Sequence, residues 1–287
     1  MTDRAARLRA SYARYVTRQG GARDPRVEAA FAAVPREAFV GPAPWFIYAG
    51  SANVPAPAYV ETPDDDPAFL YADVLIALDP KRGVNNGEPS LHARCLDALA
   101  LRPGETVLHV GAGTGYYTAL LSRLVAPNGT VHAFEIDPGL AERARTNLAG
   151  INGIIVHARS GIGEGLPAAD AIYVSAGLGA PSLTWLEALR PSGRLLFPLQ
   201  PEGGYGGMLL VTKPAVGGIS WPARFVSRAS FIQCDAPIAA GDKALESAFA
   251  GGGWEQVQTF RLDDQQDSDT WYCGIGWSLS LARSGQG

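Results

Sequence analysis

The chain has 287 residues with 47% hydrophobic side chains, and its 24 basic and 28 acidic residues give a formal net charge of −4. This length and composition suit one large domain, or a core with an appended lobe, that buries a substantial interior. No more than two Lys or Arg residues are adjacent, which argues against a duplex nucleic-acid partner. No apolar run approaches the ~18 residues of a membrane span, and the N-terminus lacks a signal-peptide core, so we expect no membrane association and a cytoplasmic location.

Three cysteines, Cys95, Cys234 and Cys273, are widely separated along the chain. An odd number at such spacing gives neither a disulfide framework nor a zinc site. We therefore predict buried free thiols and no metal site.

The N-terminal third divides into a helical part and an irregular part. Residues 5–41 are predicted to be helical, because apolar side chains recur at helical spacing from Val27 to Val34 and Pro35 then ends the pattern. Residues 42–68 are rich in Pro, Ala, Gly and Asp, which predicts an extended surface loop.

From about Ser90 strands and helices alternate with short connections. The predicted helices are 91–99, 116–125, 138–148 and 182–189, and the predicted strands are 106–110, 130–135, 154–157, 171–174 and 194–198. This alternation predicts an α/β fold with a doubly wound, mostly parallel sheet. The apolar run 208–212 could close that sheet as an antiparallel strand.

The last part of the chain differs in character and is predicted to be a small α+β lobe. Its expected elements are a strand at 225–232, a helix at 243–250, strand-like runs at 254–262 and 271–281, and a polar hairpin-type connection at 263–269. We expect Trp271, Tyr272 and Trp277 to pack rather than to stack on bases, since no basic residues lie between them. The predicted domains are 1–89 (helices and substrate-covering loops), 90–213 (cofactor-binding core) and 214–287 (extension).

Three alternating glycines, Gly111, Gly113 and Gly115, directly follow the predicted strand 106–110 and precede a helix. Such a turn leaves free backbone N–H groups at the helix start, and glycines let a ligand approach the main chain. Glu135 ends the next apolar run, at the offset of about 20 residues where an acid binds ribose hydroxyls. These features predict a nucleoside site; a turn that only connects strand to helix is the alternative.

The glycine spacing separates classes of nucleotide site. A dinucleotide fingerprint, G-x-G-x-x-G, would place glycine at Tyr116, and no Gly-Lys-Ser/Thr of a phosphate-binding loop occurs. The loop with Glu135 instead resembles the S-adenosylmethionine signature of class I methyltransferases. The resemblance implies that the cofactor contacts the six consecutive loop residues Gly111, Ala112, Gly113, Thr114, Gly115 and Tyr116.

Other candidate cofactor residues lie at predicted strand ends, which meet at one edge of a parallel sheet. Glu135 would bind the ribose and Ile136 would cover one face of the adenine. Ser160, in the turn with Gly161, could reach the adenine amine or serve only as a turn residue. Ser175 has no His/Asp pattern of a nucleophile relay, so a turn or cofactor contact is expected there.

A turn-rich polar loop runs from Asn85 through Asn86 and Gly87 into a helix whose first turn carries Ser90 and His92. Free N–H groups at a helix start attract carboxylates, which indicates a substrate role; an ordinary helix entry, with Ser90 satisfying the first donors, is the alternative. His92 is left open between packing and a substrate role. His109 lies in a buried predicted strand, where we expect it to pack.

The chain resembles the protein-L-isoaspartate O-methyltransferase family over about residues 10–212. Residues 26–40 are similar to that family's N-terminal helix and its V-P-R-E-x-F-V motif, Tyr71-x-Asp73 to its Y-x-D, and residues 107–116 to its cofactor loop. Ala180-Pro-Ser-Leu and the segment 191–198 match its later motifs. The resemblance implies a Rossmann-like class I methyltransferase fold, S-adenosylmethionine as cofactor and a peptide or protein substrate.

Two departures from the family pattern bear on the site. Gly87 falls at the serine of the family's T-I-S-x-P motif, so that Asn85, Asn86 or Ser90 would supply the polar contact. Arg159-Ser-Gly161 replaces an acidic G-D-G turn, which alters one adenine contact. The first departure bears on isoaspartyl specificity and leaves another carboxylate, for instance on a biosynthetic peptide, as an alternative acceptor.

The predicted reaction is methyl transfer to a carboxylate oxygen, most simply of an isoaspartyl or aspartyl residue. A carboxylate of pKa ~4 is already ionised and requires no general base. In this interpretation Asn85, Asn86 and Ser90 carry the catalytic positioning, and Tyr71, Asp73, Gly87 and His92 bind the substrate. The alternatives are a methyltransferase acting on an amine or hydroxyl, with His92 as base, and a non-catalytic cofactor- and peptide-binding module. A nicotinamide oxidoreductase is disfavoured by Tyr116.

Overall fold

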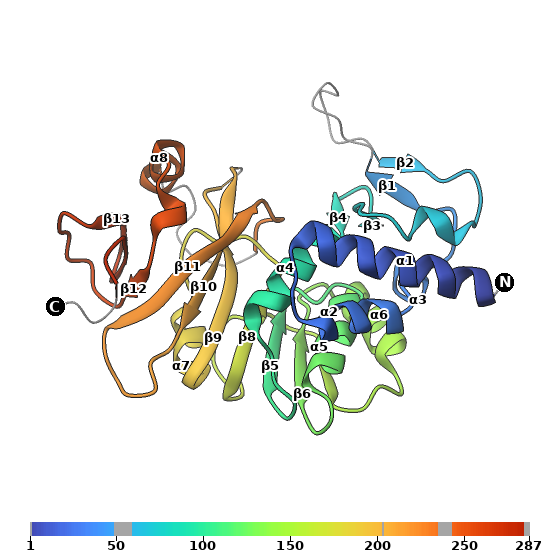
Figure 1. The fold of residues 1–287 in the computed structure, drawn as a ribbon, viewed down its shortest axis with the longest axis horizontal. Helices are drawn as coiled ribbons and strands as arrows, with labels where there is room; N and C mark the ends of the chain where they lie inside the picture. Colours follow the sequence, from blue (N-terminus) through green and yellow to red (C-terminus); the bar gives the residue numbers. More distant parts are fainter. Residues whose placement is uncertain (1, 49–58, 203, 235–242, 284–287) are drawn as a thin grey trace. The chain divides into compact units, whose positions relative to one another are not determined.

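The computed structural model describes residues 2–48, 59–202, 204–234 and 243–283 (Figure 1). The chain folds into two compact units, Met1–Gly104 with Gly111–Ser160, and Glu105–Val110 with Gly161–Gly287. Within the described ranges, no helix is both long and apolar enough to cross a bilayer.

The first unit is mainly helical. Its helices are α1 (Thr2–Gly20), α2 (Pro25–Ala33), α3 (Glu37–Val40), α4 (Pro89–Leu99), α5 (Tyr116–Val125) and α6 (Pro138–Leu148). Its strands are β1 (Phe46–Tyr48), β2 (Tyr59–Glu61), β3 (Ala77–Asp79), β4 (Val84–Asn85), β6 (Thr130–Phe134) and β7 (Ile154–His157), with a 3₁₀ turn at Pro67–Phe69. Capping residues next to the helix in sequence fix where helices begin. At the start of α6, for example, Asp137 precedes Pro138, and its side chain accepts a hydrogen bond from the N–H of Leu140.

The prediction of an extended loop over residues 42–68 is wrong in part. β1 and β2 pair antiparallel, with Phe46 opposite Glu61 and the rings of Tyr48 and Tyr59 5.7 Å apart. Short runs of aromatic and β-branched residues suffice for such a pair, and the surrounding Pro, Gly and Ala residues mask them in the sequence.

The second unit contains a continuous sheet in the order β13-β14-β12-β11-β10-β9-β8-β5. Its strands are β5 (Thr106–Val110), β8 (Ala169–Val174), β9 (Leu189–Leu199), β10 (Gly206–Thr212), β11 (Ser220–Ala229), β12 (Thr259–Arg261), β13 (Thr270–Gly274) and β14 (Trp277–Ser280). Its helices are α7 (Leu183–Ala188) and α8 (Lys243–Gly251), followed by a 3₁₀ turn at Trp254–Gln256. β5, β8 and β9 are parallel, and β10 joins β9 antiparallel, as predicted for the run 208–212.

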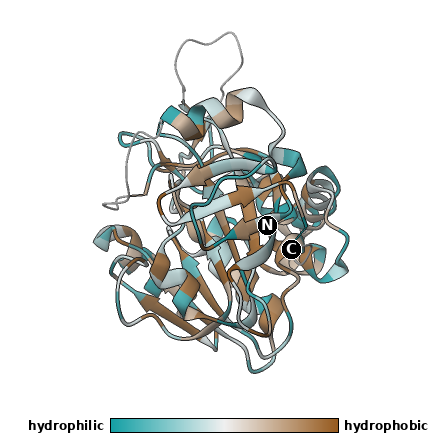
Figure 2. Ribbon diagram, turned by 90° about the vertical axis from the view of Figure 1, so that its left-hand side faces the viewer, coloured by the Kyte–Doolittle hydropathy of each residue, from teal (hydrophilic) through white to brown (hydrophobic). Residues whose placement is uncertain are grey.

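Burial explains why β5 and β8 are nearly continuous apolar runs. Val107, Leu108, Ala171 and Ile172 have no exposed surface. Figure 2 shows the brown hydrophobic colour along much of the strand ribbon. Parallel strands covered on both faces need apolar residues at every position rather than an alternating pattern.

The end of the chain departs from the predicted boundaries. The expected strand 225–232 begins at Ser220 and ends at Ala229, and the run 254–262 contains a 3₁₀ turn before β12. The run 271–281 is a hairpin of β13 and β14, because Gly276 adopts φ +74° and turns the chain.

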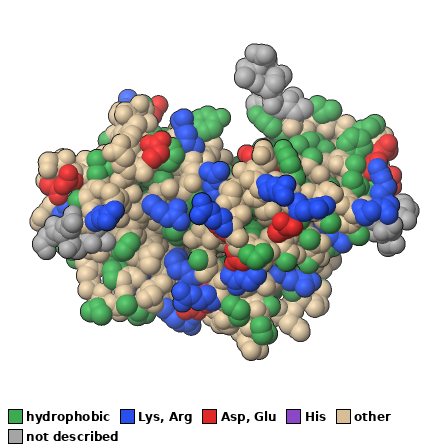
Figure 3. Space-filling model, viewed as in Figure 1, with side chains coloured by type: hydrophobic (Ala, Val, Ile, Leu, Met, Phe, Trp, Pro, Cys, Tyr) green, Lys and Arg blue, Asp and Glu red, His purple; other side chains and the backbone are tan. Residues whose placement is uncertain are grey.

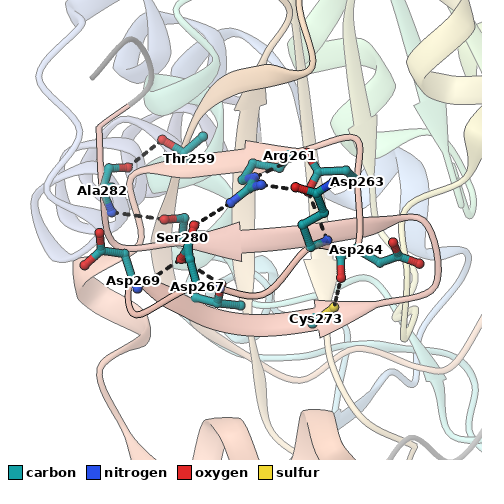
Figure 4. Close-up of polar contacts among 11 residues, drawn as sticks. Thr259, Arg261, Asp263, Asp264, Asp267, Asp269, Cys273, Ser280 and Ala282 are labelled. Carbon is teal, nitrogen blue, oxygen red and sulfur yellow. Dashed lines mark hydrogen bonds and ion pairs between the residues drawn. The ribbon is translucent and has the colours of Figure 1, made fainter. Parts of the chain in front are cut away.

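Residues 263–269 are not a hairpin connection, because β12 pairs with β14 and not with β13 (Figure 4). Arg261 anchors this segment through ion pairs with Asp263 (2.9 Å) and Asp267 (2.7 Å). The sulfur of Cys273 lies 3.2 Å from the carbonyl oxygen of Asp264 and also holds the loop against β13.

Aromatic residues fill the interior of this C-terminal part. Phe225 makes edge-to-face contacts with Phe249, Trp254 and Trp271 at ring-centroid distances of 5.5–5.6 Å. Tyr272 and Trp277 are buried, which confirms a packing role for these rings. The three cysteines form no disulfide, but the prediction that all are buried is wrong, since Cys234 and Cys273 are half-buried and Cys95 is buried.

Candidate cofactor and substrate site

The glycine loop of the first unit has a backbone that only glycine adopts without strain. Gly111, Gly113 and Gly115 have φ of +74°, +56° and +97°. A Cβ on Gly115 would lie 2.7 Å from Leu148, and one on Gly113 3.2 Å from Leu78. The N–H groups of Gly111 and Ala112 both donate to the carbonyl oxygen of Phe134 at 3.0 Å, which fixes the loop at the end of β6.

Helix α5 begins directly after this loop and has no side-chain cap at its start. The buried side chain of Thr114 lies in the turn, and the Thr114 carbonyl accepts a 3.0 Å hydrogen bond from Asn147. Tyr116 points away from the loop, since its ring packs against Phe39 and its hydroxyl lies 3.4 Å from that of Tyr12. Tyr116 therefore offers a ligand its backbone N–H rather than its side chain.

The carboxylate of Glu135 is held against the glycine loop. One oxygen accepts from the N–H of Gly113 at 2.7 Å and the other from the N–H of Asp137 at 3.0 Å. Burial raises the pKa of Glu135, and the backbone hydrogen bonds oppose this effect. The neighbouring Ile136 is 51% exposed although it is apolar. A carboxylate with remaining lone pairs beside an exposed apolar side chain fits the ribose and adenine of a nucleoside.

The β3–β4 hairpin lies beside this loop. Arg82 connects the hairpin to Asp137 by a 2.6 Å ion pair, and Arg143 donates to the carbonyl oxygen of Leu78 at 3.2 Å. Leu78 is the residue that faces Gly113. These contacts place the hairpin beside the predicted cofactor loop. The predicted substrate loop, residues 85–90, begins at the end of this hairpin and belongs to the same unit.

The polar side chains of the substrate loop largely hold the loop itself. Asn85 accepts from the N–H of Gly87 at 2.9 Å, and Ser90 donates from its hydroxyl to Glu88 at 3.0 Å. The Asn86 oxygen accepts from the N–H of Ile76 at 3.0 Å, whereas its amide nitrogen is buried without a hydrogen-bond partner in the described ranges. Both N–H donors of the Asn86 amide are therefore unused, at a buried position, within the described structure.

A side chain at position 87 and the imidazole of His92 would occupy the same space. Gly87 has φ +74°, and a Cβ on it would overlap Nε2 of His92. The His92 ring is buried and stacks on Tyr117 with 3.5 Å between ring centroids and 7° between planes. The Tyr117 hydroxyl donates to the carbonyl of Gly87 at 3.4 Å. A side chain at position 87 is therefore excluded by the histidine.

Tyr71 and Asp73 contact other parts of the same unit. Tyr71 donates its hydroxyl to Glu37, and burial together with this carboxylate raises the pKa of Tyr71. Asp73 accepts from the N–H of Ser90 at 2.8 Å and so caps the start of α4. Both residues position the loop over α4; direct substrate contact by either one stays a prediction.

Sequence reasoning missed the central role of Arg36, which lies within the V-P-R-E-x-F-V segment. Its side chain is fully buried, and it donates to the carbonyl oxygens of Leu70 (2.6 Å), Ala72 (2.9 Å) and Val74 (2.7 Å). It also lies 3.4 Å from the Asn86 oxygen. The available signal was the charged pair Arg36-Glu37 between apolar residues, since a cation that becomes buried there must find partners.

The remaining cofactor candidates divide between the two units. Ser160 ends the first unit in the turn after β7. In the second unit, the Gly161 carbonyl accepts from Trp185 at 2.7 Å. Ser175 donates its N–H to Val110 at 2.8 Å, and its hydroxyl lies 3.3 Å from Nε2 of His109. Cofactor contact by these three residues stays a prediction.

His109 is expected to make stability depend on pH. It is buried and stacked on Tyr173, and burial lowers its pKa to about 3. As pH falls below about 6.5, the unfolded chain binds a proton at His109 that the folded chain does not, so this residue alone should lower the free energy of unfolding by up to about 1.4 kcal/mol per pH unit. Urea unfolding between pH 7 and 5 measures this slope, which His109→Gln should reduce; equal slopes would contradict the assignment.

Known proteins share both the sequence pattern and the fold. The sequence model of one family, described as protein-L-isoaspartate(D-aspartate) O-methyltransferase, matches residues 12–221. The chain belongs to this family. A protein-L-isoaspartate O-methyltransferase of Methylorubrum populi is 37% identical over 232 residues, covering 79% of this chain and 92% of the relative. One of Methylorubrum extorquens is 38% identical over 207 residues, covering 70% and 78%.

Two solved structures support the fold. One titled protein-L-isoaspartate O-methyltransferase superposes with a TM-score of 0.64 at 22% identity, covering 84% of this chain and 69% of the other. The other, from Plasmodium falciparum in complex with S-adenosyl-L-homocysteine, gives a TM-score of 0.58 at 19% identity, covering 78% and 97%.

Family membership confirms the predicted Rossmann-like α/β fold, the enzyme class and the cofactor. The chain is an S-adenosylmethionine-dependent O-methyltransferase of the family that acts on protein carboxyl groups. The structure adds a steric reason for glycine at position 87, because the imidazole of His92 fills the space that a side chain would need there.

Proposed function

We propose that this enzyme methylates the carboxylate of an isoaspartyl or aspartyl residue in a peptide or protein. The observation that carries the proposal is the Glu135 carboxylate held by the N–H groups of Gly113 and Asp137, next to a substrate loop in the same unit. The three cysteines form no disulfide, which suits a reducing compartment, and a cytoplasmic location is part of the proposal.

S-adenosylmethionine would supply the methyl group when bound, and Gly111–Gly115 and Glu135 would bind it. The residues of this chain then have to align the acceptor and exclude water, since an ionised carboxylate needs no base. Alignment of this kind can lower a barrier by ~7–11 kcal/mol. The unpaired amide of Asn86 is suited to hold the acceptor carboxylate or the adjoining peptide carbonyl.

Asn85 and Ser90 act in this proposal by fixing the loop that carries Asn86. Their hydrogen bonds to Gly87 and Glu88 define the backbone of the turn. Tyr71 and Asp73 fix the neighbouring segment, and Gly87 with His92 shapes the wall of the acceptor site. A role for His92 as a base is disfavoured because its ring is only 1% exposed and stacked.

The type of bond formed tests the proposal. A peptide carrying isoaspartate or aspartate, incubated with methyl-labelled cofactor, should yield a base-labile product that releases methanol. A base-stable methyl group would indicate an amine or hydroxyl acceptor and reject the proposal. Cofactor binding without methylation of any isoaspartyl or aspartyl peptide would likewise reject the proposed acceptor.

Glu135→Gln should weaken the binding of S-adenosylhomocysteine about 10- to 100-fold, because hydrogen bonds to a charged acceptor contribute about 1.5–3 kcal/mol. Isothermal titration measures the change. Glu142→Gln is the matched control, since Glu142 lies exposed on α6, where it pairs with Arg145 at 3.1 Å. Equal affinities of the Glu135 variant and the parent would contradict the assigned ribose contact.

A further inference from the structure

Charge is distributed unevenly along this acidic chain. The first 36 residues contain eight arginines and three acidic residues, whereas the rest contains 16 basic and 25 acidic residues. Helices α1 and α2 of the first unit carry six of these arginines, of which Arg4, Arg9 and Arg26 have ion pairs. A positive helical region on a negative protein creates a local field that attracts acidic partners.

One face of helix α1 is buried, and the opposite, exposed face carries arginines. Tyr12, Ala13 and Val16 are buried, while Arg14 and Arg18 are exposed one turn apart. Neither arginine has an ion pair within the described residues. Like charges at this spacing repel each other, and an acidic ligand would relieve the repulsion. Basic side chains gather on the face of the molecule where α1 lies (Figure 3).

This basic face adjoins the predicted acceptor site. α1 packs on α4, and the exposed Arg94 of α4 donates to the carbonyl of Gly20 at 2.9 Å. A Cβ on Gly20 would overlap the carbonyl of Ser90, the second residue of α4. At ~1.5 Å per residue, Arg18 and Arg14 lie roughly 3 and 9 Å along the helix axis from that contact.

We propose that Arg14, Arg18 and Arg94 form a docking surface for acidic side chains that flank the acceptor residue, so that the enzyme selects acidic polypeptides. The inference rests on the proposed function, because it takes the loop before α4 as the acceptor site. An extended peptide covers ~3.4 Å per residue, so the roughly 3 and 9 Å along the helix axis correspond to about one to three residues of peptide. Guanidinium groups bind carboxylates through paired hydrogen bonds, so a surface of three arginines favours a peptide with Asp and Glu side chains.

The test compares two peptides with the same single acceptor, flanked either by Asp and Glu or by Asn and Gln. We expect kcat/KM to be about tenfold higher for the acidic peptide at low salt, mainly through KM, and the difference to shrink at high salt. Arg14→Glu and Arg18→Glu should abolish the preference while methylation of the neutral peptide persists. Arg123→Glu, the same change at an exposed site on α5, should retain the preference.

A binding measurement separates this inference from the proposed activity. Fluorescent peptides whose acceptor is replaced by Asn are titrated with enzyme in the presence of S-adenosylhomocysteine, and anisotropy is recorded. Preferential, Arg18-dependent binding of the acidic peptide supports the docking surface even if no peptide is methylated. Equal binding of acidic and neutral peptides, or equally tight binding of a DNA oligonucleotide of the same charge, would overturn it.

Discussion

Arg36→Met should lower the free energy of unfolding by about 3–5 kcal/mol. Methionine fills much of the volume of arginine but leaves the carbonyl oxygens of Leu70, Ala72 and Val74 without their donors in the protein interior. Each unpaired buried acceptor costs about 1–3 kcal/mol, and removing one partner of a buried charged network costs about 3–5 kcal/mol. Urea unfolding followed by far-UV circular dichroism measures the loss.

Two further variants make this result interpretable. Arg145→Met removes an exposed arginine from α6 and should change stability by less than about 0.5 kcal/mol. Arg36→Lys keeps the charge, but a compact ammonium cannot span the donor positions of a guanidinium, so it should restore only part of the stability. A loss below about 1 kcal/mol in Arg36→Met would show that the three carbonyls find other donors.

The same substitution links stability to function. Arg36 holds the segment 70–74 and approaches the oxygen of Asn86, whose free amide is proposed to hold the acceptor. Arg36→Met should therefore raise the KM for peptide more than it weakens S-adenosylhomocysteine binding, because Glu135 and the glycine loop do not contact it in the described structure. Peptide kinetics and cofactor titration on the same preparation compare the two effects.

Local signals explain why much of the α/β core could be predicted. The strand Thr106–Val110 and the helices Tyr116–Val125 and Pro138–Leu148 have their predicted bounds. Glycines or a proline with a capping aspartate mark the helix starts, and continuous apolar runs mark the buried strands. The approach of Glu135 to Gly113 also followed from sequence, since parallel strand ends meet at one sheet edge.

Features that depend on contacts between distant segments could not be predicted. The sequence around Arg36 does not reveal that three carbonyls of a segment more than 30 residues away surround the guanidinium. The sequence likewise does not show that β12 pairs with β14 rather than β13, or that Arg261 forms an ion pair with Asp267 in the polar loop. From the sequence alone, Gly87 indicates only that a polar side chain is missing at this position. The close approach of His92 in the structure explains why no side chain fits there.

Gly87→Ser should destabilise the protein by about 2–4 kcal/mol. A non-glycine residue at φ +74° costs about 1–2 kcal/mol, and the new Cβ would also overlap Nε2 of His92. His92→Val should cost about 1–3 kcal/mol by itself, because it removes a buried ring stacked on Tyr117. The overlap disappears when both substitutions are present. The double variant should therefore lose at least about 1 kcal/mol less unfolding free energy than the two single variants lose in sum.

This double-mutant cycle also tests how the pair shapes the acceptor site. If His92 occupies the space of a hydroxyl-bearing side chain, Gly87→Ser with His92→Val places a hydroxyl there and should shift the ratio of kcat/KM between isoaspartyl and aspartyl peptides. Gly87→Ala with His92→Val is the matched control, since it has the same backbone strain and the same cavity but lacks the hydroxyl. Additive stability losses would show that the two side chains do not compete for space, and an unchanged ratio in both double variants would exclude position 87 from acceptor selection.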